Sequence, residues 1–126
     1  MKVLLDTQIL LWWLADDPAL PRRAAEAISD SGTNVTVSAA TAWEIAIKKA
    51  AGRLEAPDDL IDAMGANDFE GIAITATHAL AAGQLPLHHS DPFDRMLIAQ
   101  SRVEGLTLIT IDRRFSQYDV KLLSLA

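Results

Sequence analysis

Four acidic residues of the sequence stand where an apolar segment ends or a helix begins. Asp6 and Asp112 each follow a short apolar segment, Glu44 lies within one, and Asp94 follows Asp-Pro-Phe, which is typical of a helix start. Carboxylates gathered at one edge of a sheet repel each other unless a hard cation neutralises them. The four acids therefore predict a Mg²⁺ or Mn²⁺ site and phosphoryl-transfer chemistry.

Each acid taken alone also has an ordinary structural explanation. Asp6 and Asp94 suit helix N-termini, where a carboxylate accepts hydrogen bonds from free N–H groups. Glu44 precedes Lys48 by four residues, which suits an ion pair on a helix, and Asp112 suits a turn. Glu44, however, lies about one and a half turns into its predicted helix, too deep for a cap. The joint placement of all four favours a metal site.

A carboxylate-held cation has a direct chemistry on phosphodiesters. It activates a water molecule and neutralises charge on the phosphate, and a second cation about 4 Å away stabilises the leaving oxygen. The sequence leaves the number of cations open. No serine or histidine is arranged as a nucleophile, so we predict that water attacks phosphorus.

Length and composition are those of one domain covering residues 1–126. Half of the residues are hydrophobic, which is enough for a substantial core. No apolar run approaches the ~20 residues of a membrane-spanning helix, and the N-terminus lacks the pattern of a signal peptide. Cysteine is absent, which excludes disulfides and thiolate metal sites. We expect a cytoplasmic protein with no membrane partner.

The net charge of −6 weakens a nucleic-acid partner without excluding one. Without the four acids, 11 basic residues face 13 acidic ones, which leaves −2. The basic residues are clustered, and such clusters hold phosphates beside a metal. They are Arg22-Arg23, Lys48-Lys49 with Arg53, Arg95 with Arg102, and Arg113-Arg114. Lys48, Lys49 and Arg53 are candidates for phosphate contacts, with a solvated position as the alternative for Lys49.

Short apolar strands alternate with helices along the chain, which predicts an α/β layered domain. Ligands of parallel sheets bind outside the carboxyl ends of the strands, where the acids stand. The predicted strands are 3–6, 35–37, 71–74 and 106–111, with 120–125 as a candidate for a last strand. The predicted helices are 7–15, 21–29, 39–51, 58–66, 75–82 and 92–104, with a turn of helix at 115–118.

With the acids in place, the chain resembles the PIN-domain ribonucleases, in particular VapC-type toxins of type II toxin–antitoxin systems. The resemblance is carried by four segments in family order: LLDTQILLWWL at 4–14, VSAATAWEIAIK at 37–48, LPLHHSDPFDRMLIAQ at 85–100 and LITIDRRF at 108–115. It implies an α/β/α sandwich around a mostly parallel sheet. It also assigns metal binding to Asp6, Glu44, Asp94 and Asp112.

The same resemblance implies an activity and partners. The activity is Mg²⁺- or Mn²⁺-dependent endonucleolytic cleavage of RNA. The partners are a second copy of the chain and a cognate antitoxin whose tail occupies the active-site groove, with DNA reached only through the antitoxin. The RNA that is cleaved and the antitoxin family stay open at this point.

Residues near the acids have supporting roles in this interpretation. Thr7 and Thr110 flank two of the acids and could position a carboxylate or a water molecule, with helix capping and strand propensity as alternatives. Arg95 could contact the scissile phosphate or orient Asp94. For His88 and His89 we expect loop packing or RNA contact, because neighbouring residues of a loop rarely share one ion.

Two groups of apolar residues lie on predicted helices. Trp43, Ala46, Ile47 and Ala50 share one face by their spacing. Trp12 and Trp13 belong to an unusually apolar first helix, for which core burial is the default. Two neighbouring tryptophans cannot share one face, so one is a candidate for a dimer or antitoxin interface.

Three other classes of protein fit the sequence less well than a nuclease. Phosphatases with an Asp-x-Asp-x-Thr motif need a second acid where this sequence has Gln8. Phosphoacceptor receiver domains need an acid pair after the first strand and a late strand-end lysine, which are missing. A degenerate PIN-like domain that binds RNA or protein without cutting would have lost some of its acids, whereas all four positions are acidic here.

Overall fold

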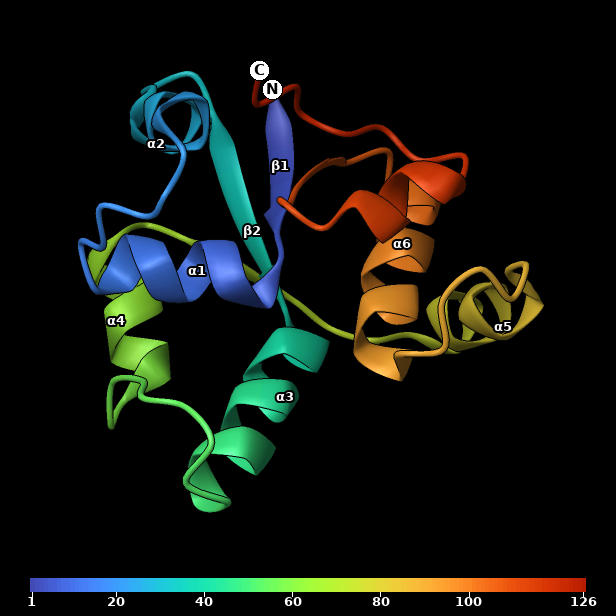
Figure 1. The fold of residues 1–126 in the computed structure, drawn as a ribbon, viewed down its shortest axis with the longest axis horizontal. Coiled ribbons are helices and arrows are strands. Elements are labelled where there is room, and N and C mark those ends of the chain that lie inside the picture. The colour runs from blue at the N-terminus through green and yellow to red at the C-terminus, as the bar shows by residue number, and fades with distance from the viewer.

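The computed structural model describes all residues, 1–126, and is built on a four-stranded parallel sheet (Figure 1). The strands are β1 (Lys2–Leu5), β2 (Asn34–Ser38), β3 (Glu70–Ile72) and β4 (Thr107–Ile109), in the order β3-β2-β1-β4. In the centre, Leu5 is in register with Ile109, and Val3 with Val35. Because the strands are parallel, their carboxyl ends all lie at the same edge of the sheet. The carboxyl ends of β1 and β4 are therefore neighbours.

Six α-helices and one 3₁₀ helix surround this sheet. They are α1 (Thr7–Leu14), α2 (Arg22–Ser29), α3 (Ala39–Ala50), α4 (Leu60–Ala66), α5 (Ala76–Gln84), α6 (Pro92–Glu104) and η1 (Arg113–Gln117). In Figure 1, α1, α2 and α4 lie to one side of the central strands, and α5 and α6 lie to the other. The longest helix, α6, has 13 residues, and no helix has both the length and the apolar character to cross a membrane.

Successive side chains of β1 point to opposite faces of the sheet, and each face carries its own part of the core. Val3 and Leu5 join one buried cluster with residues of α1 and α2, while Leu4 joins a second with residues of α5 and α6. All three side chains are fully buried, as expected of a central strand covered on both sides. This arrangement is the predicted α/β/α sandwich around a parallel sheet.

Local signals in the sequence fix the ends of the helices that carry the site. The Ser38 side chain accepts a hydrogen bond from the N–H of Ala40 and caps α3. Asp91 caps α6, with Pro92 at its first position, and Gly105 ends that helix at φ 67°, a conformation that favours glycine. These caps agree with the sequence-based predictions.

The observed elements differ from the predicted ones mainly in their bounds, and most clearly at the edges of the sheet. β4 ends at Ile109, not at Ile111, because its partner β1 ends at Leu5 and the chain turns into α1. β3 covers Glu70–Ile72, and α5 extends to Gln84. The predicted last strand, 120–125, is wrong. That segment runs beside the short β4 but makes only one parallel bridge, between Leu108 and Leu122.

The orientation of α3 is opposite to that expected of an apolar face. Trp43 and Ile47 are 62% and 45% exposed, and Ala46 and Ala50 are also exposed. The buried side of the helix instead carries Glu44 with Ile45. The Trp43 ring packs edge-on against Phe93 of α6, with ring centroids 5.4 Å apart, so α3 presents an apolar surface to solvent.

Candidate active site

A cleft of about 1000 Å³ opens at the carboxyl ends of β1 and β4, and all four predicted acids line it. Asp6 follows β1, Glu44 comes from α3, Asp94 from α6, and Asp112 from the turn before η1. Their separation in sequence reaches 106 positions, yet the parallel sheet delivers them to one place. The remaining lining residues are mainly basic or apolar: Thr7, Gln8, Leu11, Trp12, Ala15, Asp17, Lys48, Arg53, Leu54, Glu55, Asp91, Ile111, Arg113 and Arg114.

Asp6 is buried, lines the cleft and accepts hydrogen bonds through both of its carboxylate oxygens. Its Oδ1 accepts a hydrogen bond of 2.8 Å from the N–H of Ile9, so it also caps α1. Its Oδ2 accepts from the hydroxyl of Thr110, which follows β4. Its own N–H donates to the Ile109 carbonyl at 3.1 Å, which continues the β1–β4 ladder. The carboxylate is thus fixed by the sheet edge itself.

Glu44 is buried on the inner side of α3 with both oxygens occupied. Oε1 accepts from the hydroxyl of Thr7, and Oε2 pairs with the ammonium of Lys48, four residues later. The ion pair considered from the sequence is therefore present. It lies in the cleft and not on an outer helix face, because Lys48 also lines the cleft.

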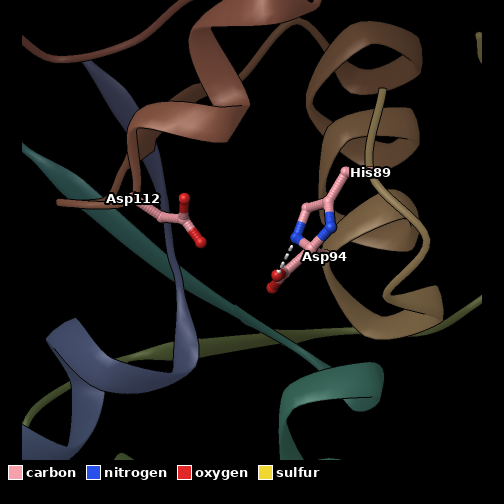
Figure 2. A group of neighbouring side chains, drawn as sticks. All are labelled: His89, Asp94 and Asp112. Atoms are coloured by element: carbon pink, nitrogen blue, oxygen red, sulfur yellow. Dashed lines mark hydrogen bonds and ion pairs between the residues drawn. The ribbon is translucent and has the colours of Figure 1, made fainter. Parts of the chain in front are cut away.

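Asp94 lies in the first turn of α6, beneath the ring of His89 (Figure 2). The His89 Nε2 is 2.7 Å from Oδ2 of this carboxylate. One potential ligand atom from each of His89, Asp94 and Asp112 lies within 4.8 Å of the other two. Figure 2 shows the Asp112 carboxylate facing the other two side chains across the cleft.

Asp112 caps η1 and forms an ion pair along the chain. Its Oδ1 accepts from the N–H of Arg114 at 2.9 Å, and the Arg114 guanidinium donates to both carboxylate oxygens, at 2.7 Å in the shortest contact. This guanidinium hydrogen bond holds the pKa of the Asp112 carboxyl below its usual range. The sequence predicts a turn at Asp112 but not this pairing with Arg114.

The pKa values of the two acids without a lysine or arginine partner, Asp6 and Asp94, shift in the opposite direction. Burial raises the pKa of Asp6 to about 6, and the charges of Asp94 and Asp112 add to the rise. Burial likewise raises the pKa of Asp94 to about 6, with the charges of Asp91 and Glu44 adding to it. Hydrogen bonds from Thr110 and Ile9 to Asp6, and from His89 to Asp94, lower these pKa values only in part. No lysine or arginine neutralises either carboxylate.

These donors fit a hard divalent cation. Mg²⁺ and Mn²⁺ prefer carboxylate oxygens, and each of the four acids offers them to the same cleft. The Asp94 Oδ1 has no hydrogen-bond donor in the protein, and the two raised pKa values mark negative charge that a cation would stabilise. Asp6 and Asp94 are the two acids of the cleft without a lysine or arginine partner, and Glu44 and Asp112 line the same cleft.

The supporting residues predicted from sequence take different positions. Thr7 and Thr110 each donate to a carboxylate of the site, Glu44 and Asp6 respectively. Arg95 does not line the cleft. Its guanidinium donates to carbonyl oxygens at the end of α5 and in the loop that follows, including those of Leu85 and Pro86 at 2.9 Å. That position does not fit a phosphate contact, because the terminal nitrogens are occupied by the loop.

One further basic residue and one histidine differ from the sequence interpretation. Lys49 is half-buried, donates to the carbonyls of Ala56 and Pro57 and to Asp58, and anchors the chain after α3, so it does not line the cleft. His89 is buried and contacts Asp94 directly, which reasoning from loop position missed. The sequence feature that could have indicated this contact is that His89 lies five residues before Asp94, in the loop that leads into α6.

The sequence matches the model of a known domain family. The family model of the PIN domain matches residues 3–121 of the chain. The chain belongs to the PIN domain family. This PIN domain is 29% identical over 119 residues to Ribonuclease VapC22 of Mycobacterium tuberculosis, covering 92% of this chain and 91% of that protein.

Solved structures share the fold of this PIN domain. VapBC2 from Rickettsia felis, bound to a DNA fragment from its promoter, has a TM-score of 0.72 at 14% identity, with 98% of each chain covered. A toxin–antitoxin complex from Klebsiella pneumoniae has a TM-score of 0.70 at 20% identity, again with 98% of each chain covered. At these identities the likeness concerns the fold alone.

Proposed function

We propose that this PIN domain is a metal-dependent endoribonuclease and the toxin of a type II toxin–antitoxin system. The observation that carries the proposal is the convergence of Asp6, Glu44, Asp94 and Asp112 on one cleft at the carboxyl edge of the sheet. The ribonuclease relative, which aligns over most of both chains, supports RNA as the substrate. Mg²⁺ is the proposed cation, with Mn²⁺ as a second cation that supports activity.

When bound, the cation would supply activation of a water molecule and neutralisation of phosphate charge. The four acids would hold it, with Asp6 and Asp94 as the main ligands, since no lysine or arginine occupies their oxygens, and Glu44 and Asp112 beside them. Thr110 keeps the Asp6 carboxylate oriented through its hydroxyl, as Thr7 does for Glu44. Among the basic residues of the cleft, Lys48 and Arg53 are proposed to hold the RNA backbone near the reacting phosphate.

The decisive experiment is cleavage of end-labelled total RNA with Mg²⁺ or Mn²⁺ against EDTA. Wild type is expected to give discrete products that need the cation, and Asp94→Asn is expected to give none. Asp58→Asn is the matched control, since Asp58 is an exposed aspartate outside the cleft. Cleavage that survives both EDTA and Asp94→Asn would contradict the proposal. Metal binding by calorimetry without cleavage of any RNA would favour a PIN-like binding domain instead.

We also propose that the exposed face of α3 joins two copies of this chain. Trp43, Ala46, Ile47 and Ala50 form an apolar strip that extends to Phe93 of α6, and solvated apolar strips of this kind mark interfaces. Analytical ultracentrifugation is expected to find a dimer that Ile47→Asp dissociates. Ile61→Asp is the matched control, because Ile61 is exposed on α4. A monomeric wild type would contradict the dimer and leave the nuclease proposal intact.

A cognate antitoxin is the second proposed protein partner. Among the structures that share the fold, the one from Klebsiella pneumoniae is a toxin–antitoxin complex. VapBC2 from Rickettsia felis and VapBC from Salmonella typhimurium are described as bound to DNA, which supports DNA contact through the antitoxin. The cleft combines acids with Lys48, Arg53, Leu54 and Trp12, so a partner segment with basic and apolar side chains fits it. A cytoplasmic location follows from RNA as the substrate and belongs to the same proposal.

A further inference from the structure

His89 is the one buried histidine in contact with a carboxylate of the cleft. Its side chain is almost fully enclosed, and its ring packs near Phe115, with centroids 6.4 Å apart. The neighbouring His88 is exposed and packs edge-on against Tyr118. Two successive histidines of one loop therefore have different surroundings, and only one of them reaches the acids.

The hydrogen bonds of the ring determine where its proton lies. Nδ1 accepts from the backbone N–H of Asp91 at 3.4 Å, and a backbone N–H can only donate. The neutral ring must therefore carry its proton on Nε2, which donates to Asp94 Oδ2 at 2.7 Å. In this tautomer Nε2 has no free lone pair for a metal, and Asp94 keeps Oδ1 for a cation.

The loop that carries His89 is itself held in place. The N–H of His89 donates to the Tyr118 hydroxyl at 2.9 Å, and that hydroxyl donates to the Pro86 carbonyl at 2.8 Å. Arg95 adds donors to Ala82 and Leu85. Asp91, whose N–H sets the tautomer, also caps α6, the helix on which Asp94 stands. The His89 ring and the Asp94 carboxylate are thus held by the same loop and the start of α6.

We propose that His89 is a positioning residue that fixes Asp94 for cation binding, by donating from Nε2, and that it is not itself a metal ligand. The proposal rests on the proposed function, since it assumes that Asp94 holds a divalent cation. A ring donor of this kind limits rotation of the carboxylate and keeps one oxygen aimed at the ion. It also gives Arg95 and Tyr118 a role, which is to hold the loop that presents His89.

The test uses calorimetric Mn²⁺ titration of the full chain and a matched pair of variants. A glutamine amide reaches the position of Nε2, whereas an asparagine amide reaches only that of Nδ1. His89→Asn and the shape-preserving His89→Phe are expected to weaken Mn²⁺ binding by roughly 10- to 100-fold, as removal of a ligand's hydrogen-bond partner typically does. His89→Gln is expected to recover most of the affinity, and His88→Phe to leave it unchanged.

The tautomer gives a second readout that does not depend on activity. Long-range ¹H–¹⁵N spectra are expected to show the Nε2–H form of His89 both without and with Mg²⁺. Loss of the Nε2 proton on cation binding would make His89 a direct ligand and overturn the proposal. So would Mn²⁺ affinities for His89→Phe and His89→Asn equal to that of wild type.

Asp94→Asn separates this inference from the proposed function. If Asp94→Asn loses Mn²⁺ binding while the His89 variants keep it, the metal site stands and the positioning role fails. If wild type binds no Mn²⁺, both fail. Should His89→Phe not fold, as judged by its amide spectrum, the Gln–Asn pair and the tautomer decide.

Discussion

The four acids of the cleft form two pairs that the protein treats differently. Glu44 and Asp112 each have a basic partner close in sequence, Lys48 and Arg114, which neutralises the carboxylate. Asp6 and Asp94 have only hydroxyl, backbone and imidazole donors, and their pKa values are raised to about 6.

This difference indicates where a cation is needed. A buried carboxylate without a positive partner destabilises the folded protein in its ionised form. The Asp6 and Asp94 pair therefore retains a negative charge that no lysine or arginine offsets, whereas Lys48 and Arg114 compensate the Glu44 and Asp112 pair. Replacing a carboxylate by an uncharged amide should therefore change the free energy of unfolding in opposite directions in the two pairs.

The largest expected effect is a divergence between activity and stability in Asp6→Asn. Cleavage should fall by more than about 100-fold, because a cation ligand is lost. The free energy of unfolding in EDTA at pH 7 should rise by roughly 1–3 kcal/mol, because the desolvated charge is removed while asparagine still caps α1. Urea unfolding measures the second quantity. A less stable Asp6→Asn protein would contradict the view that the ionised Asp6 destabilises the fold.

The second prediction concerns pH. A carboxyl whose folded-state pKa is raised from 3.8 to about 6 contributes stability below pH 3.8 and loses that contribution as the pH rises through 6. The cation-free protein should therefore be more stable at pH 5 than at pH 7, with about 1 kcal/mol of the difference due to Asp6. Thermal or urea unfolding in EDTA measures it.

Two controls isolate these groups from the histidines. The double variant Asp6→Asn, Asp94→Asn should lose the extra stability at pH 5, while the histidines still titrate. Saturating Mg²⁺ should remove or reverse the trend in wild type, because the ion binds the deprotonated acids. An unchanged pH profile in the double variant would contradict the assignment to this pair.

The third prediction tests the compensated pair by the same measurement. Glu44→Gln should lower the free energy of unfolding in EDTA by about 1 kcal/mol, because Lys48 then lacks a carboxylate in a partly buried position. The sign is opposite to that for Asp6→Asn. Glu26→Gln is the control, since Glu26 pairs with Arg22 on the exposed side of α2 and should change little. Equal signs for Glu44→Gln and Asp6→Asn would remove the distinction.

The smallest expected effect concerns Arg114. Its guanidinium occupies both oxygens of Asp112, so a cation that uses this carboxylate competes with it. Arg114→Gln should therefore tighten Mn²⁺ binding by about 3-fold, the modest gain expected for a partly exposed ion pair. Calorimetry compares it with Arg22→Gln, whose side chain lies outside the cleft. Weaker Mn²⁺ binding in Arg114→Gln would show that Arg114 supports the site.

Prediction from sequence succeeded where the information is local. The caps at Ser38 and Asp91 and the end of α6 at Gly105 follow from residue types within a few positions. The outward face of α3 could not be found this way. Spacing shows that Trp43 and Ile47 share a side of the helix, but the neighbouring elements decide which side is covered.

The sequence by itself determined the alternation of strands and helices, and with it the delivery of Asp6 and Asp112 to one edge of a parallel sheet. The tertiary structure alone decided that His89 meets Asp94, that Thr110 meets Asp6 over 104 positions, and that Arg95 braces a loop. The reason is physical. Periodicity and capping depend on neighbours along the chain, whereas a contact of about 3 Å between distant side chains depends on how whole elements pack.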